Sequence, residues 1–296
     1  LNSDSIERMG ISFDLFSHTH TEEHAEVALS ILKKLDDNGY IEPRISEEPY
    51  DPIANQFLPD RYVEGTCPHC NYESARGDQC DDCGKTLDSK ELINPRSKLN
   101  PDAKIEFRET EHLFFKLSEF RDVLLEWLSE GKGHWRPSVI NFTRNWLKEG
   151  LIDRAVTRDL DWGIEIPREG YENKRMYVWF EAVMGYYSAS VHWAKNQGKP
   201  DEWKKWWENE DSEHYYFMAK DNIPFHTIIW PAMLSGCGYK LPYDVPANEY
   251  LLLDSSQFSK SRRHAIWIPD YLDRYDPELL RFYLASIMPE QKDANF

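Results

Sequence analysis

The stretch LLLDSSQFSKSRR, residues 251–263, sets an apolar segment directly before a polar loop. Three consecutive leucines predict a strand buried on both faces, as in parallel sheets. Open α/β sheets bind their ligands just beyond the carboxyl ends of such strands. Here Lys260 lies between Ser259 and Ser261, and a compact ammonium flanked by hydroxyls favours phosphate. A solvated basic turn would have the same composition, so the loop by itself leaves both interpretations open.

Length and composition limit the possible classes of protein. The chain has 296 residues, enough for about two domains, and 41% are hydrophobic, which suffices for a core and excludes a disordered chain. The 35 lysines and arginines against 52 acidic residues give a net charge of −17, so a nucleic-acid partner would need a local basic face. There is no leader-like start and no apolar stretch of roughly 18 residues, so we expect a cytoplasmic protein.

Four of the five cysteines lie between positions 67 and 83 and form two Cys-x-x-Cys pairs. Each pair presents two thiolates to one ion, and two pairs complete a tetrahedron with no open position. A redox site would need a single pair. Ser97 and Asn100 repeat the spacing without sulfur, which suggests a second knuckle that has lost its ligands. The sequence therefore predicts one structural Zn²⁺ ion, bound by Cys67, Cys70, Cys80 and Cys83.

Apolar residues at helical spacing predict several helices. The first, at 19–39, has a capping box formed by Thr19 and Glu22 and ends at Gly39. Residues 40–61 are rich in proline and acid, which predicts an extended connection. Further helices are expected at 118–130, at 137–150 and at 226–234, the last interrupted by Pro231.

Aromatic and β-branched residues dominate the later blocks and predict strands. We expect strands at MYVWF (176–180), YYFMA (215–219) and EYLLL (249–253). Because helical patterns alternate with these strands, the sequence predicts a βαβ pattern and an α/β fold.

The loop sequence QFSKSR resembles the KMSKS signature of class I aminoacyl-tRNA synthetases. In that family the second lysine, here Lys260, stabilises the triphosphate while an amino acid is adenylated. Two residues depart from the signature. Gln257 stands where the first lysine is usual, and Arg263 stands where glycine usually follows the arginine.

Further blocks resemble the methionyl-tRNA synthetase family and follow its usual order over nearly the whole chain. They are GISFD with THTEEH, FLPDRYVEGTCPHC, ARGDQC, ETEHLFFKL, TRDLDWG, YVWFEA, KDNIPFHTIIWPAML and MPEQKD. NEYLLLD resembles the archaeal and eukaryotic branch. The resemblance implies part of a Rossmann-like class I catalytic domain with a zinc-knuckle insertion.

The same resemblance implies four segments in the chain. We expect the end of the first catalytic half and a connector at 1–55, and the connective insertion with the zinc knuckle at 56–150. The second half of the Rossmann-like domain is expected at 151–254. The KMSKS-like loop and the start of a stem-contact region are expected at 255–296.

The resemblance also implies a methionine pocket. Aromatic edges suit a soft thioether, and His226 could supply a neutral donor near the sulfur. Val183 replaces the proline that is usual after Ala182. Any one of the aromatic residues, considered alone, could equally be an ordinary residue of the hydrophobic core. Trp230 is expected to pack behind the pocket, and Asp221 to support it. The implied lining residues are Trp179, Ala182, Tyr186, Asn222 and His226.

The implied reaction is activation of methionine by ATP, with Mg²⁺, to methionyl-adenylate, followed by transfer to tRNA(Met). The implied catalytic residues are Lys260, which binds ATP, together with Ser259, Ser261 and Arg158. Arg158 resembles the family's arginine near the adenylate and the tRNA terminus, although a surface ion pair with Asp159 or Asp161 is an alternative. Two other functions remain open: a synthetase for another apolar amino acid, and a catalytically inactive zinc-containing fragment that binds tRNA or protein.

No block here resembles the HIGH motif or the anticodon-binding domain of the family, so we expect both to be missing partners. A doubly wound sheet holds its nucleotide between two halves, and only the second half is recognisable here. Residues 1–296 alone should therefore catalyse no methionine-dependent exchange of pyrophosphate into ATP, whereas adding a separately expressed first half should restore it. Robust exchange by this chain unaided would contradict the expectation.

Overall fold

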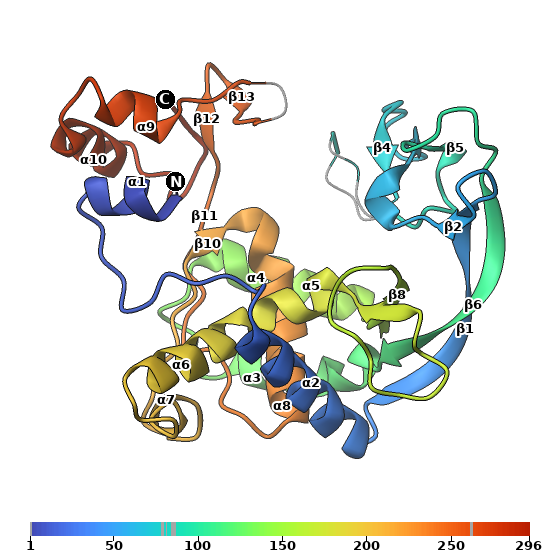
Figure 1. Ribbon diagram of the computed structural model, residues 1–296. Helices are drawn as coiled ribbons and strands as arrows, with labels where there is room; N and C mark the ends of the chain where they lie inside the picture. Colours follow the sequence, from blue (N-terminus) through green and yellow to red (C-terminus); the bar gives the residue numbers. More distant parts are fainter. Residues whose placement is uncertain (1, 78–79, 81, 84–86, 261–262) are drawn as a thin grey trace. The chain divides into compact units, whose positions relative to one another are not determined.

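The computed structural model describes residues 2–77, 80, 82–83, 87–260 and 263–296 (Figure 1). Its contacts gather the chain into two compact units, each built from separate segments. The boundaries predicted from sequence, at 55, 150 and 254, stay predictions. None of the described helices is long and apolar enough to cross a membrane. The first unit consists of Leu1–Leu35, Leu117–Leu151 and Val183–Phe296, and the second of Asp36–Lys116 and Ile152–Ala182.

A buried helix lies at the core of the first unit. In α8 (Trp230–Gly236) the side chains of Trp230, Met233 and Leu234 are fully buried. A π-helical turn at Phe225–Ile229 leads into it, so the helix expected at 226–234 is confirmed. Pro231 does not break the helix, because it lies at the junction where the π-helical turn passes into α8 and the hydrogen-bonding pattern changes.

Two further helices of this unit confirm the sequence prediction. α3 (Arg121–Ser129) packs against α4 (Pro137–Glu149), and each buries a leucine completely, Leu124 and Leu147. Gly150 ends α4 with a φ of 104°, a conformation that favours glycine. The unit's other helical elements are α1 (Asn2–Arg8), η2 (Leu117–Phe120), α6 (Gly185–Asn196), α7 (Lys204–Trp207), η4 (Lys220–Asn222), α9 (Ile268–Leu272) and α10 (Pro277–Ser286).

The first long helix, α2 (Glu22–Asp37), starts later than the predicted residue 19. The Thr21 hydroxyl accepts the backbone N–H of His24 at 3.1 Å, so Thr21 is the residue that caps the helix. The capping box assigned to Thr19 and Glu22 is therefore wrong. The stripe of buried apolar residues along the helix is as expected.

The strand predicted for the three leucines exists but has different surroundings. β12 (Leu251–Leu253) is half-buried, pairs antiparallel with β13 (Ser256–Gln257) and parallel with β14 (Ala294–Asn295). Asp254 and Ser255 both adopt a positive φ, which turns the chain straight back, as in tight hairpins. β12 is therefore the middle strand of a small three-stranded sheet, but its leucines are half-buried and not buried on both faces as predicted.

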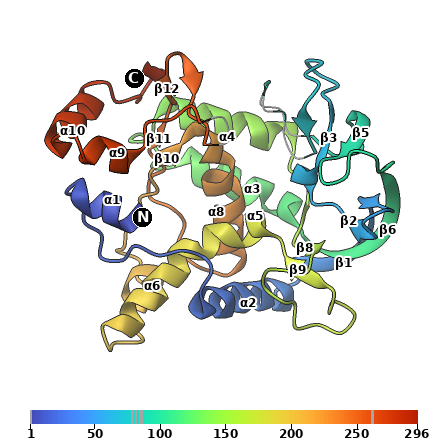
Figure 2. The same cartoon turned by 45° about the horizontal axis from the view of Figure 1, so that its top comes forward.

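The other two predicted strands are mostly not strands. In MYVWF only Met176 belongs to a strand, β9 (Lys174–Met176), and α5 (Val178–Glu181) follows. The Tyr177 carbonyl accepts the N–H groups of Phe180 and Glu181, which starts the helix. In YYFMA only β10 (Met218–Ala219) forms, and it pairs parallel with β11 (Ala247–Asn248). The two short strands lie side by side in Figure 2.

A long two-stranded ribbon dominates the second unit. β1 (Ile41–Asp51) pairs antiparallel with β6 (Glu106–Phe115) along almost its whole length. The extended connection predicted for 40–61 is thus largely a sheet strand, since its burial alternates along much of its length as on a pleated surface. The unit's remaining strands are β2 (Gln56–Phe57), β3 (Val63–Thr66), β4 (Ala75–Arg76), β5 (Ile93–Ser97), β7 (Arg154–Ala155) and β8 (Thr157–Asp159).

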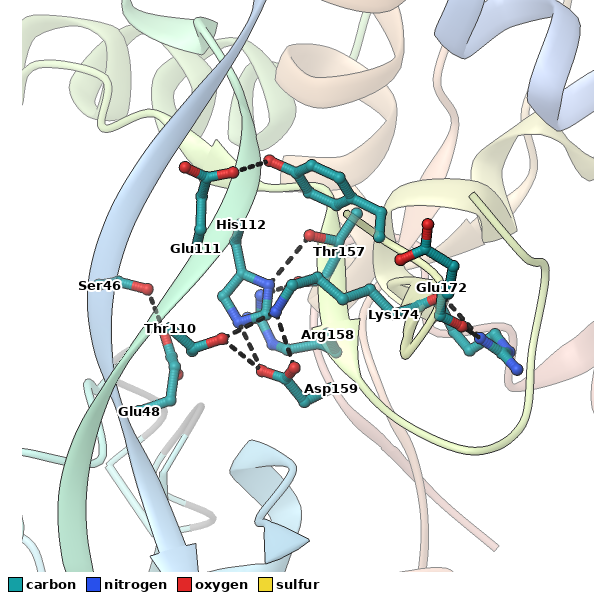
Figure 3. Close-up of polar contacts among 12 residues, drawn as sticks. Ser46, Glu48, Thr110, Glu111, His112, Thr157, Arg158, Asp159, Glu172 and Lys174 are labelled. Carbon is teal, nitrogen blue, oxygen red and sulfur yellow. Dashed lines mark hydrogen bonds and ion pairs between the residues drawn. The ribbon is translucent and has the colours of Figure 1, made fainter. Parts of the chain in front are cut away.

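A buried polar network joins β6, β8 and β9 in this unit (Figure 3). The Lys174 ammonium donates to Asp159 Oδ1 and to the Thr110 hydroxyl, both at 2.7 Å. Thr110 in turn donates to Asp159 Oδ2 at 3.0 Å, and His112 Nε2 lies 3.3 Å from the same oxygen. Burial raises the pKa of Asp159, but His112 and Lys174 outweigh it and hold the pKa below the usual value.

Replacing Lys174 by Met should lower the free energy of unfolding by about 3 kcal/mol at pH 7, because it leaves the Asp159 charge buried without its main partner. The Asp159 pKa is lowered by folding, so the stability from this carboxylate is present above its unfolded pKa and disappears as the pH falls through the folded one. The stability lost in Asp159→Asn should accordingly be larger at pH 7 than at pH 3.

Urea unfolding followed by circular dichroism measures both effects. Lys104→Met removes the same charge from an exposed position of the same unit and serves as the control, with a change expected within about 0.5 kcal/mol. Equal losses for Lys174→Met and Lys104→Met would show that the network adds no stability.

Candidate functional site

The loop after β13 presents Lys260 at its exposed tip. Ser259 and His264 close the loop by exchanging backbone hydrogen bonds of 2.9 and 3.0 Å. The His264 ring also bonds through Nε2 to the Leu253 carbonyl at 2.8 Å, which fastens the loop to β12. Ser261, another predicted site residue, lies outside the described residues. The ammonium of Lys260 is thus carried on a closed loop where it can meet an anion.

Arg263, one of the two departures from the KMSKS signature, has a physical consequence. Its φ is 54°, in the left-handed region where glycine is least strained. The backbone at position 263 therefore has a conformation that glycine adopts without steric strain. An arginine there is held in place by the hydrogen bond from its N–H to the Lys260 carbonyl, 3.2 Å.

Three residues of the predicted methionine pocket come together in the first unit. The Tyr186 hydroxyl lies 2.7 Å from His226 Nε2, and His226 Nδ1 lies 2.9 Å from the Asn222 carbonyl. A carbonyl only accepts, so Nδ1 carries the proton and Nε2 accepts from Tyr186. Burial lowers the pKa of His226, which favours this neutral form. Both ring nitrogens are thus engaged, and His226 could donate to a thioether only if the bond to Tyr186 broke.

Tyr216 is part of this cluster, and the sequence reasoning missed it. Its ring packs edge-on against Tyr186, with centroids 4.8 Å apart, and lies 5.7 Å from the His226 ring. The Trp230 indole N–H donates to the Tyr216 hydroxyl at 3.0 Å, so Trp230 supports the cluster from the core. The aromatic pair of YYFMA was the available signal, but it was assigned to a strand.

The other predicted pocket residues have different surroundings. Asp221 is exposed on η4, one residue before Asn222. Trp179 and Ala182 belong to the second unit. There the Arg61 guanidinium lies over the Trp179 ring, 5.4 Å from its centroid.

Arg158 is half-buried in the second unit and pairs with Asp60, not with Asp159 or Asp161, the alternative partners that the sequence offered. Its guanidinium lies 3.3 Å from Asp60 Oδ2 and 4.1 Å from the centroid of the Tyr177 ring. The Tyr177 hydroxyl donates to the same carboxylate oxygen at 3.3 Å. Burial lowers the pKa of Arg158, but Asp60 and Tyr177 more than compensate, so the pKa is raised. Asp159 is unavailable because Lys174 and Thr110 hold it.

The four paired cysteines converge in the second unit. Their sulfur atoms lie within 4.8 Å of one another, and two of the separations are 3.9 Å (Cys67 to Cys83) and 3.6 Å (Cys70 to Cys80). A tetrahedral ion with metal–sulfur bonds of about 2.3 Å would set sulfurs about 3.8 Å apart. A small apolar cluster that includes Leu58, Val63 and Leu92 packs around them. These residues can hold one metal ion with no open position.

Ser97 and Asn100, the suspected remnant of a second knuckle, form a hydrogen-bonded turn. The Ser97 hydroxyl donates to Asp51 at 3.1 Å and accepts the Asn100 N–H at 3.2 Å. Among the described residues the four cysteines are the only group of His, Cys, Asp and Glu side chains that could hold a metal ion. One ion is therefore what this part of the chain can accommodate.

Comparison with known proteins agrees with these features. The family described as tRNA synthetases class I (M) matches residues 1–296. The chain is 57% identical over 290 residues to a methionine–tRNA ligase of Dehalococcoides mccartyi, covering 98% of this chain and 52% of that protein. It is 54% identical over 295 residues to the methionine–tRNA ligase of Thermomicrobium roseum, and the match covers 99% of this chain and 50% of that protein. The chain spans about half the length of the curated relatives it matches.

A solved structure shows the same fold. The methionyl-tRNA synthetase of Mycobacterium tuberculosis, bound by methionyl-adenylate, aligns with a TM-score of 0.69 at 19% identity. The match covers 100% of this chain and 52% of that one. The α/β fold expected from the sequence, of the class I synthetase type, is thereby confirmed.

The purified chain should contain about one equivalent of metal, because four thiolates converge on one closed position. Cys80→Ser should reduce the metal content well below one equivalent and destabilise the second unit, since the fully closed set loses a buried ligand. Cys237→Ser changes the remaining cysteine, buried in the first unit, and should leave the metal content unchanged. Elemental analysis after gel filtration measures the metal content of the unsubstituted protein and of both variants. Less than a tenth of an equivalent of metal in the unsubstituted protein would contradict the metal site at the four cysteines.

Proposed function

This chain belongs to the tRNA synthetases class I (M) family, and on that premise we propose that it forms the middle and later part of the catalytic region of a methionine–tRNA ligase. The reaction is ATP-dependent activation of methionine to methionyl-adenylate and transfer to tRNA(Met). The observation that carries the proposal is that ligases of this name match 98% and 99% of the chain at 57% and 54% identity. The relative with methionyl-adenylate bound supports the chemistry.

In this proposal Tyr186, His226 and Asn222 form the wall of the methionine site, and Tyr216 stabilises them. The hydrogen bonds among them hold the Tyr186 ring, which stays 41% exposed, and soft sulfur favours contact with aromatic rings. Asp221, exposed beside Asn222, supports the site in this proposal. Trp179 and Ala182 complete the proposed set.

Lys260 acts on the phosphates in this proposal. ATP arrives with Mg²⁺ as part of the substrate, and negative charge builds up on the α-phosphate and on the departing pyrophosphate during adenylation. An ammonium on a closed loop can meet that charge in the transition state. Ser259 and Ser261 flank it, and Arg158, held by Asp60 and Tyr177, is the proposed contact with the adenylate and the tRNA terminus.

We further propose that the metal at the four cysteines is Zn²⁺ and that its role is structural. Thiolates are soft ligands, and a closed set of four suits zinc and leaves no position for a reacting water. The ion would tie β3, β4 and the segment around Cys80 and Cys83 together, where the apolar cluster is small. Because charged tRNA serves translation, we place the protein in the cytoplasm, with methionine, ATP and tRNA(Met) as partners.

Lys260→Ala should slow methionine-dependent pyrophosphate exchange by on the order of 10²-fold in the full-length enzyme, with little change in the KM for methionine. The reason is that Lys260 meets charge that develops mainly in the transition state. Lys148→Ala, an exposed lysine on α4, is the control and should exchange normally. Exchange kinetics at varied methionine and ATP concentrations separate the two parameters.

Two results would count against the proposal. A raised KM for methionine in Lys260→Ala, with unchanged turnover, would move this residue to the amino-acid site. If the unsubstituted full-length enzyme shows no methionine-dependent exchange but binds tRNA, the alternative of a catalytically inactive, zinc-containing binding protein is favoured instead.

A further inference from the structure

Lys220 joins three separate segments of the first unit. Its ammonium donates to Glu249 Oε2 at 2.6 Å and to Asp293 Oδ1 at 2.8 Å, and it lies 4.4 Å from the centroid of the Tyr250 ring. Asp293 also accepts the Tyr250 backbone N–H at 2.9 Å. One side chain thus ties η4 to the start of β12 and to the segment before β14.

The three segments lead to different parts of the proposed active site. Lys220 immediately precedes Asp221 and Asn222, and the Asn222 carbonyl holds the His226 ring. Glu249 lies between β11 and β12, and the far end of β12 carries the Lys260 loop through the Leu253 carbonyl and the His264 ring. Lys220 therefore connects the element of the methionine site with the strand that supports the phosphate-binding loop.

The segment that contributes Asp293 is itself fastened to β12. The Glu249 N–H donates to the Pro289 carbonyl at 2.7 Å, and the Ala294 N–H donates to the Tyr250 carbonyl at 3.0 Å. Near the hairpin the Ser255 N–H donates to Asn295 Oδ1 at 2.6 Å. β12 is thus braced along its whole length by residues 289–295, and Lys220 fixes this braced strand to η4.

The close approach of the Glu249 and Asp293 carboxylates depends on the positive charge of Lys220. Glu249 and Asp293 are two carboxylates from distant parts of the chain that share one ammonium. Burial lowers the pKa of Lys220, but the two carboxylates outweigh it and raise the pKa, so the ammonium stays charged. Without it the carboxylates would repel each other across the junction of η4, β12 and β14.

We propose that Lys220 is a positioning residue that sets the distance between the methionine site and the Lys260 loop. The proposal rests on the function proposed above and adds to it a residue that touches neither substrate. Methionine's carboxylate and the α-phosphate of ATP must meet for adenylation, so an error in their relative placement slows the reaction even when each substrate binds normally.

The test uses the full-length enzyme and three variants of this cluster and its surroundings. Lys220→Met removes the ammonium, Lys220→Arg keeps a cation able to bridge two carboxylates, and Lys292→Met removes the same charge from an exposed neighbour of Asp293. Pyrophosphate exchange is measured at varied methionine and ATP concentrations, and thermal unfolding is recorded for each protein.

We expect kcat of Lys220→Met to fall on the order of tenfold or more, with both KM values within about twofold of the unsubstituted enzyme. Lys220→Arg should recover most of the loss, and Lys292→Met should behave as the unsubstituted enzyme. If Lys220→Met does not fold, Asp293→Asn serves instead: it keeps the bond from the Tyr250 N–H, removes one carboxylate, and should reduce kcat in the same direction.

The outcomes separate this proposal from the proposed function. Unchanged kcat in Lys220→Met, or a raised KM for methionine at unchanged kcat, would overturn the positioning role and leave the function intact. Loss of activity in Lys220→Met that Lys220→Arg does not recover, with a lowered unfolding temperature, would show a merely structural role and overturn it as well. Absence of methionine-dependent exchange in the unsubstituted enzyme would overturn the function and this proposal together.

Discussion

A polar group removed from water must find a partner within the chain, and this constraint sets the conformation of the candidate site residues. His226 shows it most clearly. Its ring is buried, so one nitrogen donates to the Asn222 carbonyl and the other accepts from Tyr186, which fixes the tautomer, the rotamer of both side chains and the face they present. Arg158 obeys the same constraint through Asp60 and the Tyr177 ring.

The two units differ in the residues that form their cores. The first buries apolar helices, with Trp230, Met233, Leu234 and Ile228 wholly or nearly wholly inside. The second combines a long two-stranded ribbon with a small apolar cluster around the cysteines and with polar contacts between its segments. The Asp159 network and the four thiolates are two of the places where distant segments of this unit are tied together. A metal ion held by the four thiolates would add to the folding stability of this unit.

The lysine loop illustrates how a weak local structure can be held by its neighbours. β12 has three residues and β13 has two, too few for an independent hairpin. The hairpin persists because β14 pairs with β12 and because the His264 ring and the Lys220 ammonium fasten its ends. These contacts fasten the base of the loop that carries Lys260.

The sequence by itself determined the features whose information lies within a few residues. The cysteine spacing specified a four-thiolate cluster, and apolar stripes at helical spacing specified α3, α4 and the helix through Pro231. Only the tertiary structure decided which partners these elements meet. Arg158 and Asp60 are 98 positions apart, and Lys220 and Asp293 are 73 apart, so no local pattern could pair them. The same holds for β1, whose alternating polar sequence becomes a strand only because β6 supplies the backbone hydrogen bonds, and for β12, whose leucines alone could not show that the chain turns back at once.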